Sequence, residues 1–170
     1  MSTNLISDDP QDRFPEAAIQ ADPVVPAVHI TRDFEGTVEQ LMRAHTDPDL
    51  FVQWVGPDAI NARIDHWDCR TLGSYRYICE HDGVDQAFRG TFPEISDHRL
   101  VQTFTWEGMP EAIALETMTF TDLGDGRTRM HAFSLCDSFE GRDGMLASGM
   151  DTGVNEGYAK LDRLLAAGAL

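Results

Sequence analysis

The stretch Thr46–Pro57, TDPDLFVQWVGP, carries the apolar side chains of Leu50, Phe51, Trp54 and Val55 in a segment barely two helical turns long. Asp47 is a good N-cap, and Pro48 suits the first helical position. At the opposite end Gly56 offers a left-handed cap, and Pro57 stops the helix. A helix this short is marginal in isolation, so its apolar side chains must pack against a larger structure. The nature of that structure decides the fold.

A second short helix and a strand are predicted immediately upstream. Thr37 and Gln40 have the spacing of a capping box, which marks a helix start. The apolar side of this helix, at positions i, i+3, i+4 and i+7, consists of Val38, Leu41, Met42 and His45. Before it, the run Val24–Phe34 (VVPAVHITRDF) alternates apolar and polar residues, which predicts a first strand.

Downstream of Pro57 the helical period is replaced by segments of period two. Asp82 and Gly83 predict a tight hairpin turn, and DLGDG predicts another between the last two segments. Strands joined by such short turns are antiparallel neighbours. The six predicted strands are AINARIDHW, SYRYICEH, QAFRGTFPEI, RLVQTFTWEG, AIALETMTF and RTRMHAFSL.

The C-terminal stretch returns to helical spacing. Its apolar stripe comprises Met145, Met150, Val154, Tyr158, Leu161, Leu164 and Leu165. Glycines weaken its first half, so we expect a firm helix from about Met150 onward. This order of elements predicts an α+β fold, in which a curved seven-stranded antiparallel sheet wraps around a long C-terminal helix. The two short helices lie between strands one and two. Gly149, Gly153 and Ala159 would leave gaps between helix and sheet, and an apolar gap is a ligand pocket.

Length and composition favour one core. The chain has 170 residues, 42% of them hydrophobic, and shows no internal repeat. Residues 1–23 are polar, acidic and interrupted by prolines, so we expect a flexible N-terminal extension or a partner-binding tail. The single domain is expected to span residues 24–170.

The charge balance excludes some partners. Net charge is −16, and Lys160 is the single lysine, so nucleic acid and anionic membranes are not expected partners. The N-terminus lacks the basic and apolar regions of a secretion signal, which favours a cytoplasmic location. Cys69, Cys79 and Cys136 have neither CxxC spacing nor an even number, so we expect reduced core residues.

The sequence resembles a known family at four places. TRDFEGTVEQLMRAHTDPDLFVQWVGP is similar to the opening signature of the family of activator of Hsp90 ATPase homologues, a branch of the START-like (SRPBCC, birch-pollen-allergen-like) superfamily. HWDCRTLGSYRY, AFRGTFPEISDHRLVQTFTWEG and the closing GMDTGVNEGYAKLDRLLAAGAL match in the same order. The resemblance covers residues 24–168.

This resemblance implies the helix-grip fold, in which most members hold an apolar molecule between sheet and last helix. Some members, the polyketide cyclases and aromatases, are enzymes, and members often form homodimers. The eukaryotic namesake stimulates the chaperone's ATPase with an additional N-terminal domain, whereas this chain has a short acidic extension there. Fold analogy alone does not decide between carrying and catalysis.

Strand alternation predicts which residues line such a cavity, because residues two apart share a face. Phe51 and Trp54 from the short helix would close its mouth. The predicted lining is Phe104, Trp106, Met118, Phe120, Met130, Met150, Val154 and Tyr158. A fully packed core is the alternative interpretation of the same pattern.

Polar groups would orient the ligand. Tyr75, Tyr77 and Tyr158 offer hydroxyls. Arg76 and Arg89 could meet a carboxylate, although a solvated outer face is the expected place for a guanidinium.

Catalysis would need a tuned base or acid, and the candidates are His66, Glu116 and His131. Burial of Glu116 would raise its pKa, as general acid chemistry requires. No HxH, HxxxH or HExxH spacing joins the six histidines, so no metal site is predicted, and no cofactor motif is present.

We therefore expect a protein that binds a small hydrophobic or aromatic molecule, rather than an enzyme. Two alternatives stay open. One is a cyclase or aromatase acting on a polyketide-like substrate. The other is a protein-interaction module linked to a chaperone.

Overall fold

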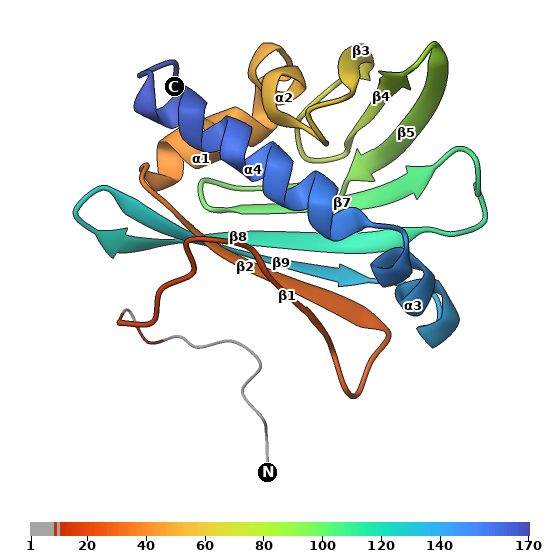
Figure 1. The fold of residues 1–170 in the computed structure, drawn as a ribbon, viewed down its shortest axis with the longest axis horizontal. Coiled ribbons are helices and arrows are strands. Elements are labelled where there is room, and N and C mark those ends of the chain that lie inside the picture. The colour runs from red at the N-terminus through yellow and green to blue at the C-terminus, as the bar shows by residue number, and fades with distance from the viewer. Residues whose placement is uncertain (1–8, 10) are drawn as a thin grey trace.

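A computed structural model describes residue 9 and residues 11–170, and shows one antiparallel sheet with helices on its inner face (Figure 1). We call the side of the sheet on which the C-terminal helix lies the inner face. The strand order is β1-β2-β9-β8-β7-β5-β4-β3, and β6 pairs with β7. The strands are β1 Ala18–Ala21, β2 Ala27–Phe34, β3 Asn61–Trp67, β4 Gly73–His81, β5 Val84–Phe92, β6 Glu94–Ile95, β7 Arg99–Trp106, β8 Ala114–Gly124 and β9 Arg127–Leu135.

The predicted pair of short helices is confirmed as α1 Val38–Thr46 and α2 Pro48–Trp54. The Gln40 backbone N–H donates to Thr37 Oγ1 at 3.2 Å, and the Thr37 N–H donates to Gln40 Oε1 at 2.9 Å, so the capping box is formed. Asp47 caps α2 by accepting from the next two free backbone N–H groups. These local signals determine where each helix begins.

The α+β class and the long C-terminal helix are confirmed, but the number of strands is not seven. The sheet has nine strands in the described part of the chain. One additional strand, β6, is a two-residue continuation beyond Pro93 that pairs with β7. The other, β1, lies inside the segment that we expected to be a flexible extension. Both are too short to show a period in sequence.

The N-terminal segment is attached to the domain from at least Phe14 onward. Strand β1 pairs with β2 over four residues, and the Asp33 N–H donates to the carbonyl of Phe14 at 2.8 Å. The Arg129 guanidinium lies over the Phe14 ring, 4.8 Å from its centroid. The sheet therefore begins at Ala18, upstream of the residue at which we expected the domain to start. Residues 1–8 and 10, for which a flexible extension was also predicted, lie outside the described residues.

The long helix is α4, Met150–Ala166, as predicted from Met150 onward. A separate helix, α3 Phe139–Ala147, precedes it. Gly149 between them has a φ of 80°, a left-handed conformation that interrupts the helical path at little cost for glycine. Figure 1 shows α4 running along the inner face, with α1 and α2 near its C-terminal end. Among residues 9 and 11–170, no helix is long and apolar enough to cross a membrane.

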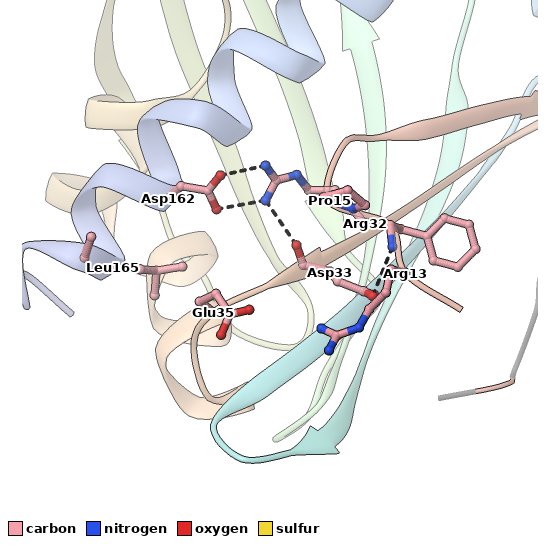
Figure 2. A pocket seen from close by; sticks show the side chains of 9 residues that line it. Arg13, Pro15, Arg32, Asp33, Glu35, Asp162 and Leu165 are labelled. Carbon is pink, nitrogen blue, oxygen red and sulfur yellow. Dashed lines mark hydrogen bonds and ion pairs between the residues drawn. The ribbon is translucent and has the colours of Figure 1, made fainter. Parts of the chain in front are cut away.

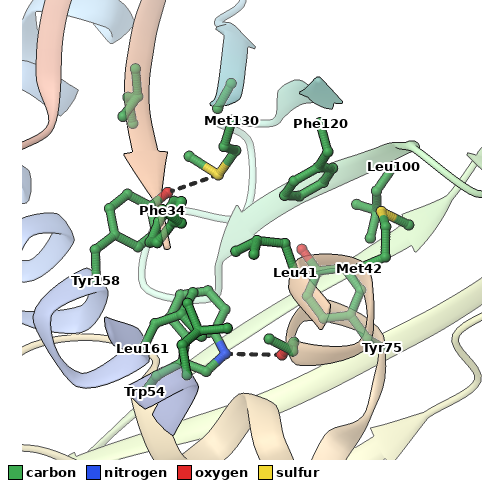
Figure 3. Close-up of a cluster of buried hydrophobic side chains, with 14 of the residues drawn as sticks. Phe34, Leu41, Met42, Trp54, Tyr75, Leu100, Phe120, Met130, Tyr158 and Leu161 are labelled. Carbon is green, nitrogen blue, oxygen red and sulfur yellow. Dashed lines mark hydrogen bonds between the residues drawn. The ribbon is translucent and has the colours of Figure 1, made fainter. Parts of the chain in front are cut away.

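Aromatic and aliphatic side chains fill most of the space between α1, α2, α4 and the sheet (Figure 3). Phe34, Leu41, Leu100 and Leu161 are almost completely buried. Glycine at position 90 allows β5 to approach the β7 backbone closely, because a Cβ there would lie 1.9 Å from the carbonyl oxygen of Thr103. Strands β3, β4 and β5 curve toward one side of α4 (Figure 1), and the candidate site lies there.

Candidate functional site

A cavity of about 420 Å³ lies between α4, the end of α2 and the inner face of β4, β5 and β7. This volume falls within the range of small-molecule pockets. The helical and loop segments contribute Trp54, Val55, Gly56, Pro57, Ile60, Met150, Gly153, Val154, Gly157 and Tyr158. The strands contribute Tyr77, Cys79, His81, Gln86, Phe88 and Phe104.

Two glycines of α4 determine how closely the helix approaches α2. A Cβ on Gly157 would lie 2.9 Å from the carbonyl oxygen of Trp54, so glycine permits direct contact between the two backbones. One turn earlier, a Cβ on Gly153 would meet only Pro57 Cδ, at 3.5 Å. The α4 helix therefore packs closely against α2 at Gly157. The space between α4 and the neighbouring residues widens toward the N-terminal end of α4, where the cavity lies.

The structure places half of the predicted ligand-binding residues on the cavity wall. They are Trp54, Tyr77, Phe104, Met150, Val154 and Tyr158. Phe120 and Met130 lie instead in the packed core, because α1 covers β8 and β9 and leaves no space above them. Phe51 lies behind the wall, with its ring centroid 5.2 Å from that of Tyr77.

The other three predicted residues also lie away from the cavity wall. The buried Tyr75 hydroxyl donates to the carbonyl of Thr103 at 2.7 Å. Met118 packs against the core. Trp106 is 39% exposed and donates from Nε1 to Gln86 Oε1 at 2.7 Å.

Sequence reasoning missed several wall residues from β4 and β5. Cys79 lies two positions after Tyr77, and Gln86 lies two positions before Phe88, so each pair shares the inner face. Tyr77 was predicted, and the period-two rule applied to these strands could also have found Cys79, Gln86 and Phe88. The loop residues Val55, Pro57 and Ile60 carry no comparable signal, because their position depends on where α2 ends.

Two tyrosine side chains, Tyr77 and Tyr158, line the cavity together with the polar side chains of His81 and Gln86. Tyr158 Oη is 3.6 Å from Met130 Sδ, a weak acceptor. Burial raises the pKa of Tyr158 and raises the pKa of Tyr77 well above its ordinary value, so both side chains are neutral phenols.

Glu116 is the one catalytic candidate on the inner face. Gln102 Nε2 donates to its Oε2 at 2.7 Å, and Ser134 Oγ donates to its Oε1 at 3.2 Å. Burial raises the pKa of the Glu116 carboxyl by more than these two hydrogen bonds lower it. Glu116 does not belong to the cavity wall, although it acts electrostatically on the hydroxyls of Tyr77 and Tyr158.

The two histidine candidates occupy the outer face of the sheet. His66 is exposed and lies 2.9 Å from Ser74 Oγ. His131 Nε2 is 3.0 Å from His29 Nδ1, and His29 Nε2 is 2.9 Å from Asp22 Oδ2. Strand alternation turns His131 away from the cavity, since its neighbours Met130 and Ala132 are the buried ones. In β3 a bulge between Ile64 and His66 shifts the register, so that His66 pairs with Arg76 on the outer face.

The arginines lie where a solvated outer face was expected. Arg76 makes a bidentate pair with Glu107, with distances of 2.8 and 2.9 Å. Arg89 is exposed. In the part of the chain that the structure describes, no three His, Cys, Asp or Glu side chains gather to hold a metal ion.

A larger hollow of about 570 Å³ lies on the other side of α4, against β2 and the N-terminal segment (Figure 2). Arg32 forms a fork with Asp162 there, with distances of 2.8 and 2.6 Å. Asp33 is paired with Arg129 at 2.8 Å. Because the Arg32 and Asp33 side chains are held in these ion pairs, we regard the smaller, more apolar cavity as the candidate site.

Comparison with known proteins agrees with this architecture. Residues 35–166 match the model of the family described as activator of Hsp90 ATPase homolog 1-like protein. Among proteins with curated descriptions, none matches the chain.

Solved structures share the fold at low sequence identity. A crystal structure of a Mycobacterium smegmatis protein is 23% identical, with a TM-score of 0.79 over 89% of this chain and 97% of its own. A Rhodobacter sphaeroides protein is 25% identical, with a TM-score of 0.79 over 88% and 98%. The AHSA1 protein from Silicibacter pomeroyi is 17% identical, with a TM-score of 0.67 over 84% and 99%.

Proposed function

Because the chain belongs to the family of activator of Hsp90 ATPase homolog 1-like proteins, within the SRPBCC superfamily, we propose that it binds a small apolar molecule between its sheet and α4. The observation that carries this proposal is the cavity of about 420 Å³ beside the N-terminal half of α4. Its wall combines aromatic rings with the flexible side chain of Met150, which suits an adaptable apolar pocket.

The arrangement favours binding over turnover. Of the three catalytic candidates, His66 and His131 lie on the outer face, and Glu116 lies beyond the cavity wall. A general acid or base must come within hydrogen-bond reach of the reacting group. We therefore propose a carrier or sensor of an apolar molecule as the function.

A plugged variant tests the proposal. Gly153→Leu would place a side chain into the cavity, because the Cβ position meets only Pro57 Cδ. We expect diphenylmethane to raise the melting temperature of the natural protein, and to raise that of Gly153→Leu little or not at all. Titration calorimetry would give the dissociation constants of both.

Thr152→Leu is the matched control, since Thr152 is the exposed neighbour on the same helix. Its binding should equal that of the natural protein. Equal binding by Gly153→Leu would place the ligand elsewhere and contradict the proposal. Absence of binding to the natural protein across a panel of apolar compounds would also contradict it.

A further inference from the structure

The hydroxyl of Tyr77 lies at the cavity wall and has no hydrogen-bond partner among the described residues. Tyr77 is only 7% exposed, and no described residue hydrogen-bonds its Oη. In contrast, the neighbouring Tyr75 hydroxyl on the same face of β4 donates to Thr103. Buried hydroxyls are nearly always hydrogen-bonded, so an unpaired one requires an explanation.

The explanation is that this hydroxyl reaches the open space of the cavity. The fully enclosed side-chain atoms without a partner in the described residues are Arg32 Nε, His45 Nε2 and Arg127 Nη1. Tyr77 Oη is not among them, so it contacts open space, and Tyr77 lines the cavity. Its ring is fixed between Phe51 and Phe88, with centroids 5.2 Å away on both sides. The donor therefore has a fixed position.

The remainder of the wall offers little to a charged ligand. Asp, Glu, Lys and Arg are absent from the described residues that line it, and the wall residue His81 already contacts the Ala59 carbonyl and Asp82. Lys160 lies nearby and donates to the carbonyl of Pro57 at 3.3 Å. The Glu116 carboxyl, which lies beyond the wall, raises the pKa of the Tyr77 hydroxyl through its charge. An anionic group placed beside Tyr77 would be desolvated without a fixed cationic partner.

We propose that the ligand is an uncharged apolar molecule that carries one hydrogen-bond acceptor oxygen, such as a ketone, which accepts from the Tyr77 hydroxyl. This inference rests on the proposed function, because it concerns the chemistry of the same cavity. It excludes fatty acids and other carboxylates as the preferred ligands. It also makes Tyr77 the residue that determines specificity, while the aromatic wall supplies the contact area.

Three probes of similar shape test the inference at neutral pH. They are benzophenone, diphenylmethane, which lacks the carbonyl oxygen, and diphenylacetate, which is anionic. We expect benzophenone to bind about twofold to tenfold more tightly than diphenylmethane, as one net hydrogen bond allows, and diphenylacetate to bind most weakly. The infrared carbonyl band of bound benzophenone should move to lower frequency.

Tyr77→Phe should remove the preference for benzophenone and the band shift, while diphenylmethane binds as before. The variant should fold, because the hydroxyl has no partner among the described residues. Tyr75→Phe, on the same strand and face, is the control. This variant should keep the preference for benzophenone and the shift of its carbonyl band.

Equal affinities for benzophenone and diphenylmethane in the natural protein would overturn the inference while leaving the proposed function intact. A preference for diphenylacetate, lost in Lys160→Met, would overturn it in favour of an anionic ligand. Failure of all three probes to bind would overturn the proposed function together with the inference.

Discussion

His45 is a histidine that the fold keeps uncharged. Its side chain is 5% exposed, and its ring lies against Trp54 and Phe120, with centroid distances of 4.7 and 5.1 Å. Nδ1 is 2.7 Å from the carbonyl oxygen of Leu41 and acts as the donor, whereas Nε2 is enclosed without a partner in the described chain. Burial lowers the pKa of His45 from 6.5 to about 4.

The low pKa predicts a loss of stability in mild acid. Between about pH 6.5 and pH 4 the unfolded chain binds a proton at His45 that the folded chain does not, so stability falls as pH falls through this window. The expected loss from pH 7 to pH 5 is about 2 kcal/mol. The free energy of unfolding in urea should be measured at pH 7 and pH 5. The decrease between these two values of pH should be smaller for His45→Phe than for the natural protein, by the contribution of His45.

His98→Gln, at an exposed position, serves as the control for this experiment. Other groups with shifted pKa contribute equally to each protein and cancel in the comparison. Glu116, whose pKa is raised, gives a slope of opposite sign, since stability falls as pH rises through its folded-state pKa. If the free energy of unfolding of His45→Phe changed with pH as much as that of the natural protein, the low pKa of His45 would be contradicted.

At the scale of elements, the contact between α2 and α4 positions the candidate site. The α2 helix was recognisable in the sequence from its N-cap and its Gly-Pro stop, and its apolar residues indicated a larger partner. The structure identifies this partner as α4 together with β3. The contact is close because Gly157 has no side chain, whereas Gly153 faces space.

Alanine at these two positions should have opposite effects. Gly153→Ala should stabilise the protein by about 0.5–1 kcal/mol, because alanine favours helix and its Cβ makes an ordinary contact. Gly157→Ala should destabilise it by about 1–3 kcal/mol, since its Cβ would press against the Trp54 carbonyl and force the helices apart. Thermal unfolding of the two variants measures the difference, and equal melting temperatures would refute the role given to Gly157.

At the scale of the whole molecule, the N-terminal segment completes the sheet. Besides the pairing of β1 with β2, Arg129 Nη2 donates to the carbonyl of Asp12 at 2.7 Å, and Arg129 Nε donates to Asp33 Oδ1 at 2.8 Å. Both side chains of the Arg129–Asp33 pair are at most 10% exposed. A buried ion pair depends on all of its hydrogen-bonding partners, so the segment contributes to the stability of the sheet edge.

Two truncated chains would measure this contribution. A chain that begins at residue 22 should be less stable than one that begins at residue 9, by about 2–4 kcal/mol, because it lacks β1 and the contacts to Arg129. The free energy of unfolding in urea gives the comparison, and hydrogen exchange should increase along β2. Equal stability of the two chains would show that the segment is dispensable.

The sequence alone determined the elements whose signals lie within a few residues: the capping box at Thr37, the Asp47 cap, the strand alternation and the family resemblance. It also identified six of the sixteen described residues that line the cavity. Tertiary structure alone decided the remainder, including β1 and β6, the coverage of Phe120 by α1 and the open space beside Gly153. The physical reason is range: caps and periods depend on neighbouring residues, whereas a cavity depends on distances between elements far apart in the chain.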